Sequence, residues 1–223
     1  MRNSPQAEKQ NQAEPAAESL KNSWPANVGF CTWLVLLALG MGWLAIYSRT
    51  SADEMAYPDS IVDARFRNST SARSGTNAQL RRNETVLCFL HPKCPCSIAT
   101  LRELQKILEE ADCESILYFY TPAGFDTDTW LNTQLVNEAK RCPKFRIECD
   151  SDGKVADRFQ VTTSGTILLY GTEGTLRFGG GITASRGHAG PSDAGEALRS
   201  SLLLPLSNAA FTFPAFGCKL KRS

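Results

Sequence analysis

The sequence carries almost no net charge, few histidines and no internal repeat. Its 24 lysines and arginines against 23 acidic residues leave a formal charge of +1 at pH 7, and histidine occurs twice. This balance offers no general attraction for nucleic acid or acidic ligands, so we expect no nucleic-acid partner. No GxGxxG segment opens a helix, which argues against a dinucleotide-binding loop. The glycines at 179–181 are therefore interpreted as a sharp turn.

The eight cysteines do not form an obvious disulfide framework. A chain of 223 residues has room for a hydrophobic core that needs no covalent staples. Only Cys94 and Cys96 are closely spaced. Most of the others lie in strand-like segments, at the ends of predicted helices or in an apolar run, where inert thiols are common: Cys88 and Cys149, Cys113 and Cys142, and Cys31.

Charge is absent altogether from residues 28–47, which as a helix would be roughly 30 Å long. Trp24, Trp43 and Tyr47 lie near its ends, as interfacial aromatic residues do. A cleaved signal peptide and a buried soluble helix are the alternatives, and residues 38–40 offer a small-x-small cleavage site. However, about 27 mostly polar residues precede the run, which is long for a signal peptide. We expect an uncleaved transmembrane helix that contacts the lipid bilayer.

The rest of the chain divides by composition. Residues 1–27 read as a disordered tail, 48–84 as a tether, 85–205 as a folded domain and 206–223 as a C-terminal tail that docks on it. Within the domain, hydrophobic patterns predict strands at 85–90, 115–120, 145–149, 166–170 and 175–178. Helices are predicted at 97–111, from 126 or 127 to 141, at 153–159, and from 192 or 193 to 204. This alternation predicts an α/β sandwich with a mixed sheet, parallel early and antiparallel in the late hairpin.

The element order, with a cysteine pair after the first main strand, resembles that of thioredoxin-like proteins. Residues 150–161 match a D-x-x-G-x-x-A-x-x-F-x-V run of membrane-tethered thiol–disulfide proteins, and segments 89–97, 179–188 and 216–218 resemble the bacterial, membrane-anchored RedB-type branch. The resemblance implies a thioredoxin-like sandwich that acts on protein thiols or disulfides. Two features depart from ordinary thioredoxins. The pair is C-P-C instead of C-x-x-C, and Gly165 stands where thioredoxins carry a cis-proline that shapes the peptide-binding groove.

Cys94 and Cys96 are predicted to lie between the end of a strand and the start of a helix. Unpaired N–H groups and the helix dipole favour a thiolate at that place. We expect Cys94 to attack because it is outermost, and Cys96, next to the capping Ser97, to resolve, although the reverse order stays open. A disulfide with only Pro95 between its cysteines forms a small ring that conflicts with relaxed disulfide geometry, and such strain raises the reduction potential.

Both histidines fall near this pair in the predicted topology. His188 and Arg186 lie on the loop after the hairpin, which should reach toward the cysteines, His188 as an acid/base group and Arg186 as a thiolate partner. His91 or His188 is instead a candidate Cu(I) ligand with the two thiols. The plainer interpretations are that His91 packs beneath the loop and that His188 caps the last helix. Cys218, in the aromatic C-terminal tail, is a candidate third thiol for a relay or an alternative disulfide.

The leading hypothesis is a membrane-tethered thiol–disulfide oxidoreductase without a cofactor, whose domain lies outside the cytoplasm, in the periplasm of a bacterium. A copper metallochaperone that uses Cys94, Cys96 and His91 is the second. A non-catalytic membrane-anchored binding module and a thiol peroxidase-like enzyme, with Cys218 resolving, are the remaining alternatives.

Overall fold

The computed structural model describes residues 24–50, 57–59, 84–111, 113, 115–171, 174–204 and 210–221. The chain divides into two compact units, Met1–Tyr47 and Ser48–Ser223. In the first, helix α2 (Trp24–Arg49) contains the predicted span, and its residues Asn27–Arg49 are long and apolar enough to cross a membrane. Length and composition fit a membrane anchor or a signal sequence equally. The predicted tail up to residue 23 and most of the predicted tether lie outside the described residues.

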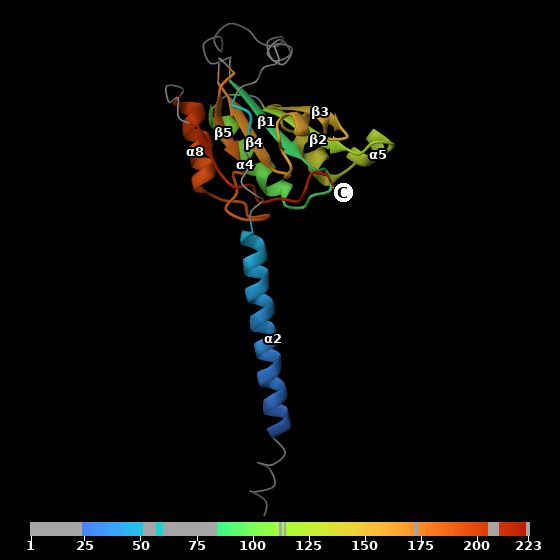
Figure 1. The fold of residues 1–223 in the computed structure, drawn as a ribbon, viewed down its shortest axis with the longest axis vertical. Coiled ribbons are helices and arrows are strands. Elements are labelled where there is room, and N and C mark those ends of the chain that lie inside the picture. The colour runs from blue at the N-terminus through green and yellow to red at the C-terminus, as the bar shows by residue number, and fades with distance from the viewer. Residues whose placement is uncertain are drawn as a thin grey trace, which may run out of the picture. The chain divides into compact units, whose positions relative to one another are not determined.

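The second unit is built on one six-stranded mixed sheet (Figure 1). The strands are β1 (Thr85–Leu90), β2 (Ser115–Thr121), β3 (Phe145–Ser151), β4 (Thr166–Tyr170), β5 (Leu176–Gly180) and β6 (Phe211–Thr212), in the order β3-β2-β1-β4-β5-β6. Strands β1, β2 and β3 are parallel neighbours, whereas β4 is antiparallel to both β1 and β5. The predicted α/β sandwich with a mixed sheet is confirmed.

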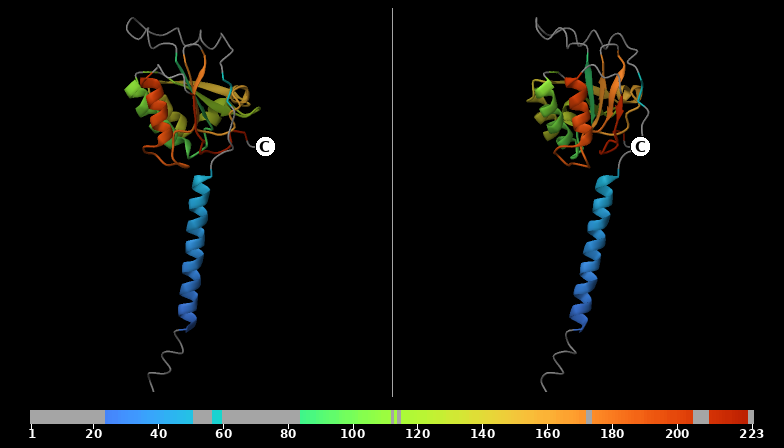
Figure 2. Two further views of the ribbon diagram at one scale, coloured as in Figure 1. Left: turned by 60° about the vertical axis from the view of Figure 1, so that its left-hand side comes forward. Right: turned by 90° about the vertical axis from the view of Figure 1, so that its left-hand side faces the viewer.

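Five helices flank this sheet in the described part of the unit: α4 (Ser97–Ala111), α5 (Thr127–Leu131), α6 (Gln134–Lys140), α7 (Lys154–Arg158) and α8 (Asp193–Leu203). One core lies between the sheet and α4, α6 and α8, and Figure 2 shows α4 and α8 side by side on this face. The opposite core joins the other sheet face to α7 and to two side chains from distant segments, Tyr57 and Leu220. Strands β1, β2 and β4 are almost wholly buried because both of their faces are covered.

The helix predicted from 126 or 127 to 141 is in fact two helices. Asp126 caps α5, since its carboxylate accepts the Thr129 N–H at 2.8 Å, as the sequence suggests. Thr133 is extended and its hydroxyl accepts the Val136 N–H at 3.3 Å, so it caps a new helix, α6. The hydrophobic pattern predicts one continuous helix, but a second N-cap at Thr133 divides it into two.

The late part of the domain also differs from the prediction. Gly179 and Gly180 are strand residues of β5, so they do not form the predicted sharp turn. Phe211 and Thr212, assigned from sequence to a tail, pair in parallel with β5 as the edge strand β6. Cys149 is exposed on β3 instead of buried, whereas Cys88 is fully buried as expected. The ordered domain therefore extends past residue 205.

Leu104, on the inner face of α4, is fully buried, and its replacement tests the packing of this helix on the sheet. Leu104→Ala should lower the free energy of unfolding by about 2–5 kcal/mol, because it removes buried methyl groups and leaves a cavity. Chemical denaturation followed by circular dichroism measures the loss. The control is Arg102→Ala on the outer face of the same helix, where the side chain is half exposed. An equal loss in both variants would contradict the assignment of the inner face.

Candidate functional site

The candidate site lies at the edge of the sheet where β1 ends and β4 begins. Because these strands are antiparallel, the turn after Leu90 lies beside the segment before Thr166, and Phe89 is paired with Thr166. The loop after β5 leaves the same edge, since β5 runs antiparallel to β4. Three segments far apart in sequence therefore meet there.

The cysteine turn is closed by backbone hydrogen bonds. The Cys94 N–H donates to the His91 carbonyl at 3.0 Å, and the Ser97 N–H donates to the Cys94 carbonyl at 3.2 Å. Helix α4 then begins at Ser97, so both cysteines precede its first turn as predicted. Cys94, however, is only 3% exposed, while Pro95 is exposed and Cys96 is half-buried. The expectation that Cys94 is the outermost thiol is wrong, because the turn directs Pro95 outward and Cys94 inward.

Ser164 links this turn to the segment before β4. Its hydroxyl accepts the His91 N–H at 2.7 Å and shares a 2.8 Å hydrogen bond with the hydroxyl of Ser97. Ser97 is thus the first residue of α4 and a partner of Ser164. Sequence reasoning passed over Ser164, because a serine in a polar loop carries no signal of a partner 73 positions away.

Gly165 completes the segment before β4. It has a φ of +92°, which favours glycine, and its N–H donates to the Phe89 carbonyl at 2.8 Å. A Cβ at this position would lie 3.0 Å from the hydroxyl of Thr100. No peptide bond among the described residues is cis. The local conformation is therefore that of a glycine turn, hydrogen-bonded to the end of β1.

Three sulfur atoms gather at this edge. The Sγ atoms of Cys94 and Cys218 are 2.9 Å apart, and those of Cys94, Cys96 and Cys218 all lie within 4.8 Å of one another. Cys218 reaches the pair because its segment runs antiparallel to the residues before β4. The Ser164 N–H donates to the Cys218 carbonyl, and the Leu220 N–H donates to the Thr162 carbonyl, both at 2.8 Å. The strand-like pairing therefore brings together cysteines 124 positions apart.

The three thiols have different acidities. Burial raises the pKa of Cys94, but hydrogen bonds from the Cys218 thiol, from Ser97 and from the backbone outweigh it and hold that pKa below the ordinary value. Burial and the charge of Cys94 raise the pKa of Cys96. Burial, the hydrogen bond to Cys94 and its charge raise the pKa of Cys218 to about 12. Cys94 is therefore the most acidic of the three thiols.

Arg186 lies close to Cys96 and Cys218. Its guanidinium donates a hydrogen bond to the Gly217 carbonyl, and its charge lowers the pKa values of Cys96 and Cys218 against the raising effects. The loop that carries it passes the cysteines as expected, since a Cβ on Gly187 would lie 3.9 Å from the Cα of Cys96.

Neither histidine belongs to the sulfur cluster in the described part of the chain. The His91 ring stacks on Tyr120 with centroids 5.7 Å apart, and its Nδ1 accepts the Lys93 N–H at 3.1 Å. His188 is exposed, and the cap of α8 is Ser192 instead, which accepts the Gly195 N–H at 3.0 Å. Cys218 is thus the third member of the sulfur cluster, where the sequence analysis expected His91 or His188.

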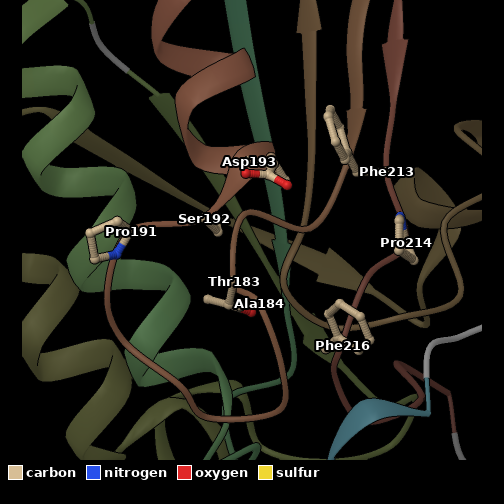
Figure 3. A pocket seen from close by; sticks show the side chains of 9 residues that line it. Thr183, Ala184, Pro191, Ser192, Asp193, Phe213, Pro214 and Phe216 are labelled. Atoms are coloured by element: carbon tan, nitrogen blue, oxygen red, sulfur yellow. The ribbon is translucent and has the colours of Figure 1, made fainter.

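A pocket of about 380 Å³ lies beside residues 213–216 of the C-terminal segment. Figure 3 shows Phe213, Pro214 and Phe216 of that segment facing the start of α8 and the loop after β5. The lining holds few polar groups, notably Thr183 and Asp193. Sequence analysis had no signal for this pocket, because its walls come from three separate segments.

No family model and no curated protein matches the chain. Among solved structures, a hypothetical protein from Sinorhizobium meliloti 1021 is 18% identical, with a TM-score of 0.50, over 78% of this chain and 93% of that one. An uncharacterized conserved protein from Geobacillus kaustophilus is 15% identical, with a TM-score of 0.51, over 78% and 91%. A secreted disulfide oxidoreductase of Mycobacterium tuberculosis is 17% identical, with a TM-score of 0.39, over 56% and 84%. The second unit has a thioredoxin-like α/β fold.

The depressed pKa of Cys94 predicts a thiolate that forms at lower pH than an ordinary thiol's. Cys218→Ala removes its sulfur donor and should shift the thiolate titration upward by about one pH unit. The measurement is thiolate ultraviolet absorbance against pH, as the difference from Cys94→Ser. Cys218→Ser keeps a hydroxyl donor and should shift it less, while the exposed Cys149→Ala should not shift it. An unchanged profile in Cys218→Ala would disprove the hydrogen-bond origin of the shift.

Proposed function

We propose that this protein is a membrane-tethered thiol–disulfide oxidoreductase of the RedB type that exchanges disulfides with other proteins. The observation that carries the proposal is the buried Cys94 with its lowered pKa, in contact with a second thiol at the start of a helix. The lowered pKa favours reactivity, because the thiolate is the attacking species. The thioredoxin-like fold accords with this chemistry.

The exchange has two balanced steps. The Cys94 thiolate attacks one sulfur of a target disulfide, a new S–S bond forms, and the other target sulfur leaves as a thiolate. A neighbouring thiol of this chain then loses its proton, attacks Cys94 and releases the second target thiol. Two electrons have passed from the chain to the target, and an external dithiol reductant resets the pair. Run in reverse, the same steps oxidise a target dithiol.

The tether and the compartment are part of the proposal. Helix α2 is apolar over the length that a bilayer requires, and aromatic residues stand at Trp43 and Tyr47 near one end. Disulfides persist in oxidising compartments outside the cytoplasm, such as the bacterial periplasm. An enzyme that exchanges disulfides is most useful there, which supports a periplasmic location for the domain.

The test is the reduction of insulin disulfides by the detergent-solubilised chain with a dithiol reductant. Wild-type protein should accelerate the reaction, and Cys94→Ser should reduce it to the rate of the reductant alone, because no thiolate remains to attack. The matched control is Cys149→Ser, at an exposed cysteine on β3 remote in sequence from the turn. Full activity in Cys94→Ser would refute the proposal and favour a non-catalytic binding module.

A soft-metal site is the second candidate, because three sulfur ligands lie within 4.8 Å of one another. Thiolates bind soft metals such as Cu(I) and zinc, and a set of three sulfurs favours Cu(I) because structural zinc takes four ligands. Cys94, Cys96 and Cys218 would hold the ion, with His91 left out because it packs on Tyr120. Such a chain would act as a copper metallochaperone, binding the ion as cargo.

Competition with a chromophoric Cu(I) chelator tests this candidate. Cys218→Ser should weaken Cu(I) binding by more than about tenfold, since loss of a direct ligand costs at least as much as loss of a supporting group. His91→Ala should leave the affinity unchanged. Equal affinity in wild type and Cys218→Ser would dismiss the three-sulfur site.

A further inference from the structure

We propose that Cys218 is the resolving thiol, so that the redox couple is a Cys94–Cys218 disulfide between the domain and its C-terminal segment. The inference rests on the proposed function for Cys94 as the attacking thiol, and it replaces the sequence-based expectation that Cys96 resolves.

The distance to Cys94 favours Cys218 over Cys96 as the resolving thiol. The Cys218 Sγ lies 2.9 Å from the Cys94 Sγ, already in hydrogen-bond contact. A bridge between Cys94 and Cys96 would instead close a small ring around Pro95, whose fixed φ restricts the turn. The cross-segment bridge has no such constraint, because its two cysteines lie on different backbone segments.

The C-terminal segment is held in place without a covalent bond. Residues Thr163 and Lys219 form an antiparallel bridge, flanked by the hydrogen bonds from Ser164 and Leu220. Leu220 is 2% exposed and packs in the core on the α7 side of the sheet. Gly217 allows the close approach, since a Cβ there would overlap the Ser164 carbonyl. The resolving sulfur is thereby positioned in advance.

Contact places Cys218 for the second step. With the C-terminal segment docked, the Cys218 Sγ lies 2.9 Å from the Cys94 Sγ, within reach of a mixed disulfide at Cys94. Arg186 holds the adjoining backbone, since its guanidinium donates a hydrogen bond to the Gly217 carbonyl. Cys218 releases its proton to solvent, forms the S–S bond to Cys94 and expels the target thiolate.

Burial adds a requirement for movement. Cys94 is 3% exposed beneath the docked segment, so a target disulfide reaches it only when the segment around Cys218 moves aside. Return of the segment to residues 162–164 then delivers Cys218 to the mixed disulfide. The return of the segment to its docked position therefore also brings Cys218 to attack the mixed disulfide at Cys94.

Thiol trapping and peptide mapping of the full chain in detergent micelles, across glutathione redox buffers, test this inference. Wild type should form a reversible Cys94–Cys218 bridge, and Cys96→Ser should form the same bridge. Cys218→Ser should stop at a Cys94–glutathione mixed disulfide. Gly217→Val keeps every thiol but blocks docking, so it should also accumulate the mixed disulfide. Cys149→Ser is the control for loss of an unrelated thiol.

A Cys94–Cys96 bridge in wild type, unchanged in Cys218→Ser and Gly217→Val, would overturn the inference. In that case insulin reduction that survives in Cys218→Ser leaves the proposed function intact. Conversely, a reversible Cys94–Cys218 bridge in a chain that reduces no protein disulfide would reject the proposed function and retain the couple. The two failures are therefore distinguishable.

Discussion

The antiparallel pairing of β1 with β4 is the constraint on which the site depends. It places the turn after Leu90 against the segment before Thr166, and Ser164 then ties the two together through His91 and Ser97. The same segment offers its outer edge to the C-terminal residues, so one short stretch of backbone organises both partners of the sulfur cluster. Any shift in this register would separate the thiols, because the cysteine turn is held through the Ser164 hydroxyl and the Cys218 segment through backbone hydrogen bonds to residues 162–164.

Different surroundings give the three thiols different acidities. Thiols alike in the unfolded chain acquire a lowered pKa at Cys94 and raised pKa values at Cys96 and Cys218, through burial, hydrogen bonding and mutual repulsion. The proposed disulfide exchange and the proposed soft-metal binding would use the same three sulfurs. The two activities would therefore exclude each other at any moment, because a bound metal would occupy the sulfurs that a bridge joins.

Much of the fold can be predicted from local sequence patterns. Alternating strands and helices, the cysteine pair after the first strand and the caps at Asp126 and Ser192 are short-range features, and the structure has each of them. The misses involve competing local signals or distant partners. Thr133 starts a second helix inside a continuous apolar pattern, and Phe211–Thr212 becomes a strand only because β5 has a free edge beside it. The burial of Cys94 and the exposure of Cys149 likewise depend on what covers them.

By itself, the sequence determined the α/β class, the apolar segment at 28–47 and the place of Cys94 and Cys96 before a helix, because each is encoded in residues within one or two turns of the chain. Only the tertiary structure decided which third group joins the pair. Composition offered two histidines and a distant cysteine as equals. Backbone pairing of Thr163 with Lys219 brings in Cys218, while the aromatic packing of His91 on Tyr120 keeps that histidine out. Contacts between segments so far apart in sequence are decided by the whole fold.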